Sequence, residues 1–126
     1  MSDDNSNKTT LNKAIVLPVH TVVLSYGGRD YMIDPTKVPF TIGRDASCNL
    51  TVNSNFASRQ HCKILFHNKN FILKDNSTNG TFMRTGGAPP VKLQDSMLSI
   101  TSNGSIKLGE AMKVGDTDVI SFKVNF

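Results

Sequence analysis

The sequence predicts an all-β protein, a β-sandwich of two sheets with about eleven strands. Two observations predict this class. Apolar residues recur with period two in many short segments, and no stretch shows a helical period. Gly, Pro, Asn and Asp gather between these segments, as is typical of turns and hairpins. In such a sandwich alternate side chains are buried between the sheets, and the loops gather at the two ends.

The first six expected strands lie between residues 20 and 75. The pair Gly27-Gly28 separates the first two, and such a pair between alternating segments is typical of a tight hairpin. Further along, Cys62 and Ile64 share one face of a segment whereas Lys63 lies on the other, which indicates a strand. These six strands are expected at 20–26, 29–33, 40–42, 50–52, 61–66 and 71–75.

The second half of the chain contains shorter apolar segments separated by strong turn signals. These signals are Gly86-Gly87, Pro89-Pro90 and Asn103-Gly104. In the last segment Ile120 and Phe122 alternate with polar residues, which again indicates a strand. Five strands are expected here, at 81–83, 91–93, 97–100, 105–108 and 119–126.

The length of 126 residues predicts a single domain with a hydrophobic core. Apart from Met1, residues 1–13 contain one large apolar residue, Leu11, so we expect a flexible N-terminal tail followed by one sandwich domain at 14–126. No apolar run reaches the length of a signal-peptide core or a membrane span. Cys48 and Cys62 form no C-x-x-C pair, and we expect both to be buried and reduced. The sequence therefore predicts a cytoplasmic protein with no membrane partner.

The charge pattern argues against nucleic acid as a partner. The net charge of +4 comes from 14 basic and 10 acidic residues, and no basic run concentrates it. The chain has no Trp and two Tyr, so aromatic surfaces for base stacking are scarce. This charge supports no more than a general preference for an anionic partner.

Three polar loops stand at the ends of expected strands and carry the chemistry. They are Ile42–Asp45, Phe56–His61 and Asn76–Thr81. If the loops converge at one end of the sandwich, they bring together Arg44, Ser58, Arg59, Thr78 and Asn79. Nearly all of these side chains are hydrogen-bond donors, and guanidinium groups bind phosphate oxygens in a bidentate manner. The set therefore predicts a site for a phosphorylated side chain.

Taken in order, these motifs resemble the forkhead-associated (FHA) domain, a phosphothreonine-binding β-sandwich of the FHA/SMAD-like kind. The order is Gly43-Arg44, Ser58-Arg59, His61, Asp75 and Ser77–Thr81. Each piece alone occurs by chance in many proteins, whereas their combination in this order and spacing is specific. The motifs run from Phe40 to Phe82, and the strand pattern extends the resemblance over residues 15 to 126.

The resemblance implies a role for each matching residue. Arg44 and Ser58 would bind the phosphate, and Arg59 would also face the phosphopeptide. Asn79 would hold the main chain of the peptide, and Thr78 would help form the pocket for the threonine methyl group. Three further residues would be architectural: Gly43, His61 and Gly80.

The resemblance also implies a function without catalysis or a cofactor. The chain would be a bacterial module that recruits a phosphothreonine-containing protein in Ser/Thr kinase signalling. Similar bacterial modules can be closed by a phosphothreonine in their own N-terminal tail, which makes Thr9 and Thr10 candidate ligands. Selection among phosphothreonine sites is expected to fall to other loops, including those at 84–92 and 101–104.

The sequence leaves other functions open. A flank of the sandwich could assemble proteins without phosphate. The chain also resembles FHA domains joined to bacterial nucleotide cyclases around "FASRQH", "STNGTF" and "SIKLGE", so it could be a regulatory domain excised from a larger signalling enzyme. An anion-binding enzyme would need a base near Arg44, where Asp45 and Asp75 are the motif-adjacent carboxylates, and the chain has no G-x-S-x-G elbow. The spacing of cysteines and histidines does not suit a metal site.

Overall fold

The computed structural model describes residues 20–125, which form eleven strands and one turn of 3-10 helix. Their bounds are β2 (Thr21–Tyr26), β3 (Arg29–Ile33), η1 (Pro35–Lys37), β4 (Phe40–Gly43), β5 (Leu50–Thr51), β6 (Cys62–His67), β7 (Asn70–Asp75), β8 (Thr81–Thr85), β9 (Val91–Leu93), β10 (Met97–Ile100), β11 (Gly104–Leu108) and β12 (Ile120–Asn125). Each strand overlaps one of the eleven expected segments, with bounds that differ by at most two residues, and residue 126 of the last segment lies outside the described residues. The predicted all-β sandwich is therefore confirmed.

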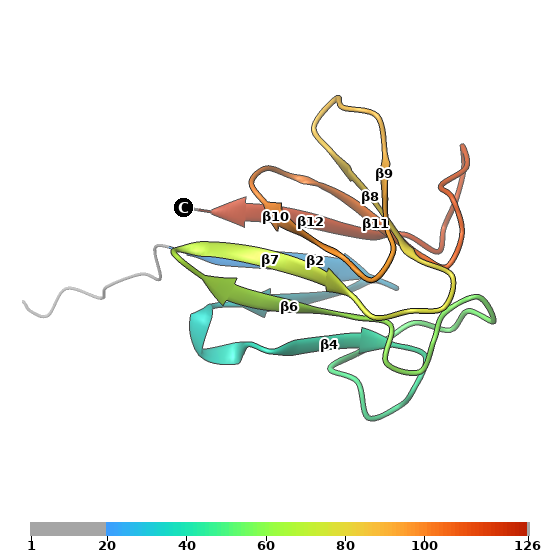
Figure 1. Cartoon of the computed structure of the whole chain (residues 1–126), viewed down its shortest axis with the longest axis horizontal. Coiled ribbons are helices and arrows are strands. Elements are labelled where there is room, and N and C mark those ends of the chain that lie inside the picture. Colours follow the sequence, from blue (N-terminus) through green and yellow to red (C-terminus); the bar gives the residue numbers. More distant parts are fainter. Residues whose placement is uncertain (1–19, 126) are drawn as a thin grey trace, which may run out of the picture.

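The strands form two sheets, and Figure 1 shows β4, β6 and β7 of one of them side by side. The six-stranded sheet has the order β3-β2-β12-β11-β8-β9, and the five-stranded sheet has the order β10-β7-β6-β4-β5. The pair β4 and β5 is parallel, with Ile42 opposite Leu50, whereas the other pairs are antiparallel. Residues 44–49 therefore form the loop that leaves the end of β4 and brings the chain back so that β5 runs parallel to the last residues of β4.

The core lies between the sheets and is built from the alternate residues that the period-two patterns predicted. Cys62 and Ile64 of β6 are buried, and so are Ile120 and Phe122 of β12. Phe71 of β7 is also fully buried. Each large apolar side chain removed from water contributes about 1.5–3 kcal/mol, so this layer supplies most of the drive to fold.

Two expectations from composition can be compared with the described residues. Cys48 and Cys62 are free thiols and both are buried, as predicted. Within residues 20–125, the structure contains no helix with the length and hydrophobicity that a membrane crossing requires. The predicted tail at 1–13 and the first residues of the predicted domain, 14–19, lie outside the described residues.

Four loops gather at one end of the sandwich, at the right in Figure 1. We call this the loop end; it consists of residues 44–49, 52–61, 76–80 and 109–119. The Arg44 N–H donates to the Ser58 carbonyl at 2.9 Å, which joins the loops after β4 and β5. The Gly109 N–H donates to the Gly80 carbonyl at 2.9 Å, which joins the loops after β11 and β7. The loops therefore converge as the sequence predicts.

Candidate functional site

Two guanidinium groups stand at the loop end without carboxylate partners. Arg44 Nε donates to the Ala57 carbonyl at 3.0 Å, which fixes the direction of the side chain. The Arg59 backbone is held by Asp45, whose N–H donates to the Arg59 carbonyl at 3.2 Å. Both arginine side chains are exposed, and neither makes an ion pair within residues 20–125. Both positive charges are therefore available to an anion.

Ser58 connects the loop after β5 to the loop after β7 through its hydroxyl. Ser58 Oγ accepts the Thr78 backbone N–H at 3.1 Å. Because the oxygen serves as an acceptor in this bond, its proton remains available to donate elsewhere. Ser58 is half-buried, and its carbonyl also accepts the Arg44 N–H. A neutral donor therefore lies beside the guanidinium groups.

The turn at Thr78 and Asn79 presents the other two predicted binding side chains, and both are exposed. Asn79 Nδ2 donates to the Phe56 carbonyl at 3.1 Å, so the carboxamide bridges two loops. Its Oδ1 makes no hydrogen bond within the described residues. Such a carboxamide can accept an N–H and donate its second hydrogen to a carbonyl, which suits the backbone of an extended peptide.

His61 lies fully buried between the same two loops. Its Nδ1 accepts the Ser58 backbone N–H at 2.9 Å, so Nε2 carries the proton and donates to the Gly80 carbonyl at 2.8 Å. Burial lowers the pKa of His61, even though the Gly80 carbonyl and the Asp75 carboxylate favour the charged form. The imidazole is therefore a neutral link between the loops.

Asp75 organises the loop after β7 from the interior and is fully buried. Its Oδ1 accepts the hydroxyls of Ser77 at 2.6 Å and Thr81 at 2.7 Å, and its Oδ2 accepts the Asp95 N–H at 2.8 Å. Burial by itself raises the pKa of Asp75, but these hydrogen bonds outweigh it and hold the pKa below its ordinary value. Both oxygens serve the fold, which suits a structural acid rather than a general base.

Two glycines allow the loops to approach each other this closely. A Cβ at Gly43 would lie 2.1 Å from the Arg59 carbonyl oxygen and 2.9 Å from the His61 nitrogen, where no side chain can fit. Gly80 has a φ of +90°, a conformation that residues with a Cβ rarely adopt. Any side chain at either position would push apart the loops that carry the candidate donors.

Gln94 also shapes the site, and the sequence analysis missed it. Its Nε2 donates to the carbonyl of Ser77 at 3.1 Å and to that of Thr78 at 3.4 Å. The position of Gln94 depends on β9 returning beside β8, with Leu93 opposite Thr81. No local pattern in the segment around Gln94 signals that pairing, so the sequence offered no sign of this role.

The aromatic side chain of Phe56 is a second contributor that was missed. It is 51% exposed although it is large and apolar, and its carbonyl is the one that Asn79 contacts. A Cβ at Gly109 would lie 2.1 Å from the same carbonyl oxygen, so the loop after β11 packs directly against Phe56. The feature of the sequence that could have indicated this role is a single aromatic residue, Phe56, within an otherwise polar loop.

The two loops that were expected to select among phosphopeptides have their turns at the other end of the molecule. The Gly86 N–H donates to the Asn103 carbonyl at 2.9 Å, which joins the two turns. Strand β8 begins at the loop end with Thr81 and reaches these turns at Thr85. One residue of the segment 84–92, Lys92, does approach the loop end, because its aliphatic stem lies beside Gly80. The expectation that the turns of these two loops select among phosphopeptides is therefore wrong.

The thiols and histidines of the described part form no metal site. No group of three or more His, Cys, Asp or Glu side chains there is arranged to hold a metal ion. Burial raises the pKa of Cys48, with a further contribution from Asp45, and burial also raises the pKa of Cys62. Both thiols are therefore protonated at neutral pH and are poor ligands and nucleophiles.

The fold and the loop end define a β-sandwich interaction domain with a positively charged, donor-rich surface. The family model described as the FHA domain matches residues 40–109, which is more than half of the chain. The chain therefore belongs to the FHA domain family, as its motifs indicated. A search of curated proteins by sequence found no match.

Solved structures agree with this fold. The chain is similar to Mycobacterium tuberculosis Rv1747 FHA-1, with 19% identity and a TM-score of 0.64, over 85% of this chain and 98% of that one. It is similar to the FhaA FHA domain complexed with the intracellular domain of Rv3910, with 24% identity and a TM-score of 0.58, over 82% and 99%. It is also similar to the MEK1 FHA domain in complex with a HOP1 phosphothreonine peptide, with 21% identity and a TM-score of 0.62, over 88% and 100%.

Proposed function

We propose that the chain is a phosphothreonine-peptide-binding module that recruits a phosphorylated protein partner in Ser/Thr kinase signalling. The observation that carries the proposal is the set of unneutralised donors at the loop end, from Arg44, Arg59 and Ser58. Phosphorylation converts a neutral hydroxyl into a group with about two negative charges and three acceptor oxygens, which is what such donors bind. The complex of the MEK1 FHA domain with a phosphothreonine peptide supports the same reading.

The proposal assigns the binding contacts as follows. Arg44 would bind the phosphate with its terminal amino groups, because its Nε is already used by the Ala57 carbonyl. Ser58 would donate its hydroxyl proton to a second phosphate oxygen, and Arg59 would add charge from the adjacent position. Asn79 would pair with the peptide backbone, since its Oδ1 has no other partner within the described residues.

Selection of phosphothreonine over phosphoserine rests on one methyl group. We propose that the exposed side chain of Thr78 helps form the pocket for this methyl group. A methyl group in an apolar pocket contributes about 1–3 kcal/mol, so the preference would be about 5- to 150-fold. Phosphoserine peptides should therefore bind measurably but weakly.

The proposed activity is recognition and not catalysis, because FHA domains are binding modules. The resemblance to FHA domains joined to bacterial nucleotide cyclases extends the proposal, since a bound phosphoprotein would then regulate an attached enzyme. The cytoplasm is the compartment we propose, because the free thiols of Cys48 and Cys62 suit a reducing environment.

A fluorescence-polarisation assay tests the function directly. A degenerate phosphothreonine peptide library is titrated beside its phosphoserine and unphosphorylated forms, against the wild type, Arg44→Ala and Arg84→Ala. Arg84 is an exposed arginine of β8 outside the site and controls for charge. Saturable binding of the phosphothreonine library, lost in Arg44→Ala and kept in Arg84→Ala, supports the proposal. Binding that survives phosphatase treatment and Arg44→Ala supports a phosphate-independent scaffold.

The N-terminal tail supplies a second candidate ligand for the same site. We propose that phosphorylated Thr9 or Thr10 can occupy it within the same chain. Full-length protein treated with the host's kinases should then bind peptide more weakly than untreated protein. Mass spectrometry that finds no phosphate on either threonine removes this part of the proposal.

A further inference from the structure

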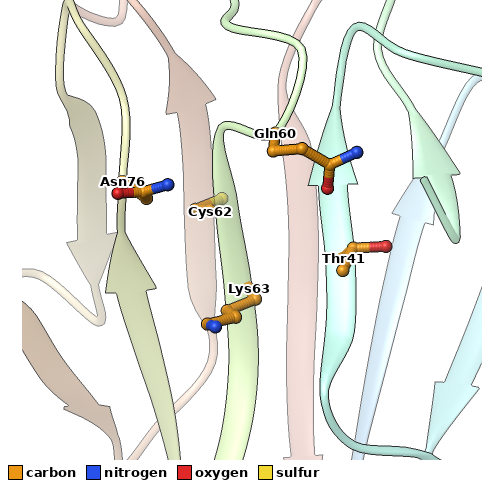
Figure 2. Close-up of a pocket in the computed structure, with 5 residues that line it drawn as sticks. All are labelled: Thr41, Gln60, Cys62, Lys63 and Asn76. Carbon is orange, nitrogen blue, oxygen red and sulfur yellow. The ribbon is translucent and has the colours of Figure 1, made fainter. Parts of the chain in front are cut away.

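A shallow hollow lies on the outer face of the five-stranded sheet, beside the loop end. Figure 2 shows its five lining residues, with Lys63 of β6 between Thr41 of β4 and Asn76, which follows β7. The hollow has a volume of about 110 Å³. Pockets for cofactors and drug-sized ligands measure about 300–1,000 Å³, so this one suits a single small group. Its lining residues are Thr41, Gln60, Cys62, Lys63 and Asn76.

Lys63, which lines the hollow, has a second lysine beside it on the neighbouring strand. Lys63 of β6 stands directly opposite Lys74 of β7. Residues paired in this way have Cβ atoms about 4.5–5.5 Å apart on one face, and like charges there are destabilising. Both lysines are half-buried, and neither makes an ion pair or hydrogen bond within residues 20–125. The sheet therefore carries two adjacent positive charges, and a bound anion would reduce the repulsion between them.

Of the other polar side chains that line the hollow, two already make hydrogen bonds to neighbouring residues and one makes none. Thr41 Oγ1 donates to Asn49 Oδ1 at 3.0 Å and accepts the Asn49 N–H at 3.0 Å, and Gln60 Nε2 uses one of its two hydrogens to donate to Ser47 Oγ at 3.3 Å. The Asn76 carboxamide makes no hydrogen bond within the described residues. An entering anion would thus meet the Lys63 ammonium group and the free Asn76 amide, and the Lys74 charge on the neighbouring strand would add to the attraction.

The hollow lies close to the proposed phosphothreonine site along both loops. Gln60 follows Ser58 by two residues, and Asn76 precedes Thr78 by two residues. Two residues span at most about 7 Å of chain. An extended peptide bound at Ser58 and Thr78 would reach the hollow within about two to four of its own residues.

We propose that this hollow binds a second anionic group of the same phosphopeptide, either a phosphate or a carboxylate. The inference rests on the proposed function, because Arg44 and Ser58 would hold the phosphothreonine while Lys63 and Lys74 hold the second group. The module would then select partners in which an acidic or second phosphorylated residue lies near the phosphothreonine. Charge on the partner, and not only its phosphothreonine, would set the affinity.

The test is a spacing scan with matched variants. A phosphothreonine peptide with alanine flanks is compared with peptides in which Glu or phosphoserine is moved through positions two to four on either side. The proteins are the wild type, the double variant Lys63→Met/Lys74→Met and the control Lys123→Met. Methionine keeps an unbranched side chain, and Lys123 is exposed on β12 of the other sheet. Comparison of the Glu and phosphoserine series identifies which anion the hollow prefers.

The expected result is a gain in affinity of about 3- to 10-fold at one or two spacings in the wild type. The double variant should lose this gain while it binds the alanine-flanked peptide as well as the wild type does. The Lys123→Met control should keep the gain. An equal gain at every spacing, or one that the double variant retains, would overturn the proposal because it would reflect general charge attraction.

A second measurement separates the two proposals. If neither the degenerate phosphothreonine library nor any phosphothreonine peptide of the spacing scan binds, the proposed function fails, and the hollow is tested alone by titration with inorganic phosphate at constant ionic strength. Saturable NMR shifts of the Lys63, Lys74 and Asn76 amides, absent in the double variant, would support an anion site. If those amides do not respond, the anion site is refuted as well.

Discussion

His61 Nδ1 accepts the backbone N–H of Ser58 at 2.9 Å, a bond that only the neutral imidazole can make. On the opposite side of the ring, Nε2 donates to the Gly80 carbonyl at 2.8 Å. A second proton would place an N–H of the ring against the N–H of Ser58. Protonation of His61 would therefore break the link between the two loops that carry the candidate donors.

The first prediction is that the free energy of unfolding falls as pH drops through the range just below about 6.5. Burial lowers the pKa of His61 in the folded state, whereas the unfolded chain keeps a pKa of about 6.5. The unfolded state therefore binds more protons in this range, and stability that is present above pH ~6.5 is lost as pH falls through the folded pKa. Urea denaturation without peptide measures this effect free of the phosphate's own titration near pH 6.

His67 provides the control for this pH dependence. It is the exposed last residue of β6, so His67→Gln should leave the loss of stability on acidification unchanged. NMR titration of the His61 ring supplies the direct check. A His61 pKa at or above about 6.5 would contradict the prediction.

Much of the fold follows from patterns that a sequence displays locally. Alternation in the segments around Ile64 and Phe122 identified strands and their buried faces, because side chains point to opposite sides of a strand in turn. The order of Gly43-Arg44, Ser58-Arg59 and the loop at Asn79 then located the candidate site, because each motif lies at a strand end.

Sheet order and long-range pairing could not be derived in the same way. Gln94 reaches the loop after β7 because β9 pairs with β8, and no local pattern encodes that partner. The turns around Gly86 and Asn103 were placed near the site although the strands carry them to the other end. Composition marks where the chain turns, whereas the end of the sandwich at which it turns depends on the whole topology.

The second prediction concerns the carboxamide of Asn79. In Asn79→Asp an oxygen would replace Nδ2 and face the Phe56 carbonyl, and a negative charge would stand near the proposed phosphate site. Phosphothreonine-peptide affinity should fall at least about 10-fold, whereas stability should change by less than about 1 kcal/mol because the side chain is exposed. Fluorescence polarisation and urea denaturation measure the two effects.

The matched control for Asn79 lies at the far end of β7. Asn70 Nδ2 donates to the Asn68 carbonyl at 3.1 Å, the same kind of contact in an exposed turn. Asn70→Asp should leave peptide affinity within about 1.5-fold of the wild type. An equal loss of affinity in both variants would show that negative charge anywhere on the surface, and not the position of Asn79, is responsible.

The third prediction concerns the close approach at Gly43. A methyl group there would lie 2.1 Å from the Arg59 carbonyl oxygen, so Gly43→Ala must displace the Ser58–His61 segment. We expect a loss of about 2–4 kcal/mol in unfolding free energy, together with weaker peptide binding. Gly87→Ala is the matched control, because a Cβ at Gly87 meets no atom within 4 Å. If the two variants proved equally stable, the packing described at Gly43 would be wrong.

The fourth prediction concerns the buried carboxylate of Asp75. In Asp75→Asn one oxygen becomes an NH2 group, which would either face the Asp95 N–H or replace the charged acceptor of the Ser77 and Thr81 hydroxyls. Hydrogen bonds to a charged group contribute about 1.5–3 kcal/mol each, so the unfolding free energy should fall by about 2–4 kcal/mol. Urea denaturation at neutral pH measures the loss.

The acid limb of the stability curve provides an independent readout for Asp75. Its hydrogen bonds hold its pKa below the ordinary value of about 3.9, so its contribution is present above pH ~4 and is lost as pH falls through the folded pKa. This component of the pH dependence should be missing in Asp75→Asn. The control is Asp30→Asn, because Asp30 is exposed and its carboxylate accepts from Ser25 alone among the described residues. A change within about 0.5 kcal/mol in Asp75→Asn, similar to that expected for Asp30→Asn, would mean that a neutral amide can hold the loop after β7 equally well.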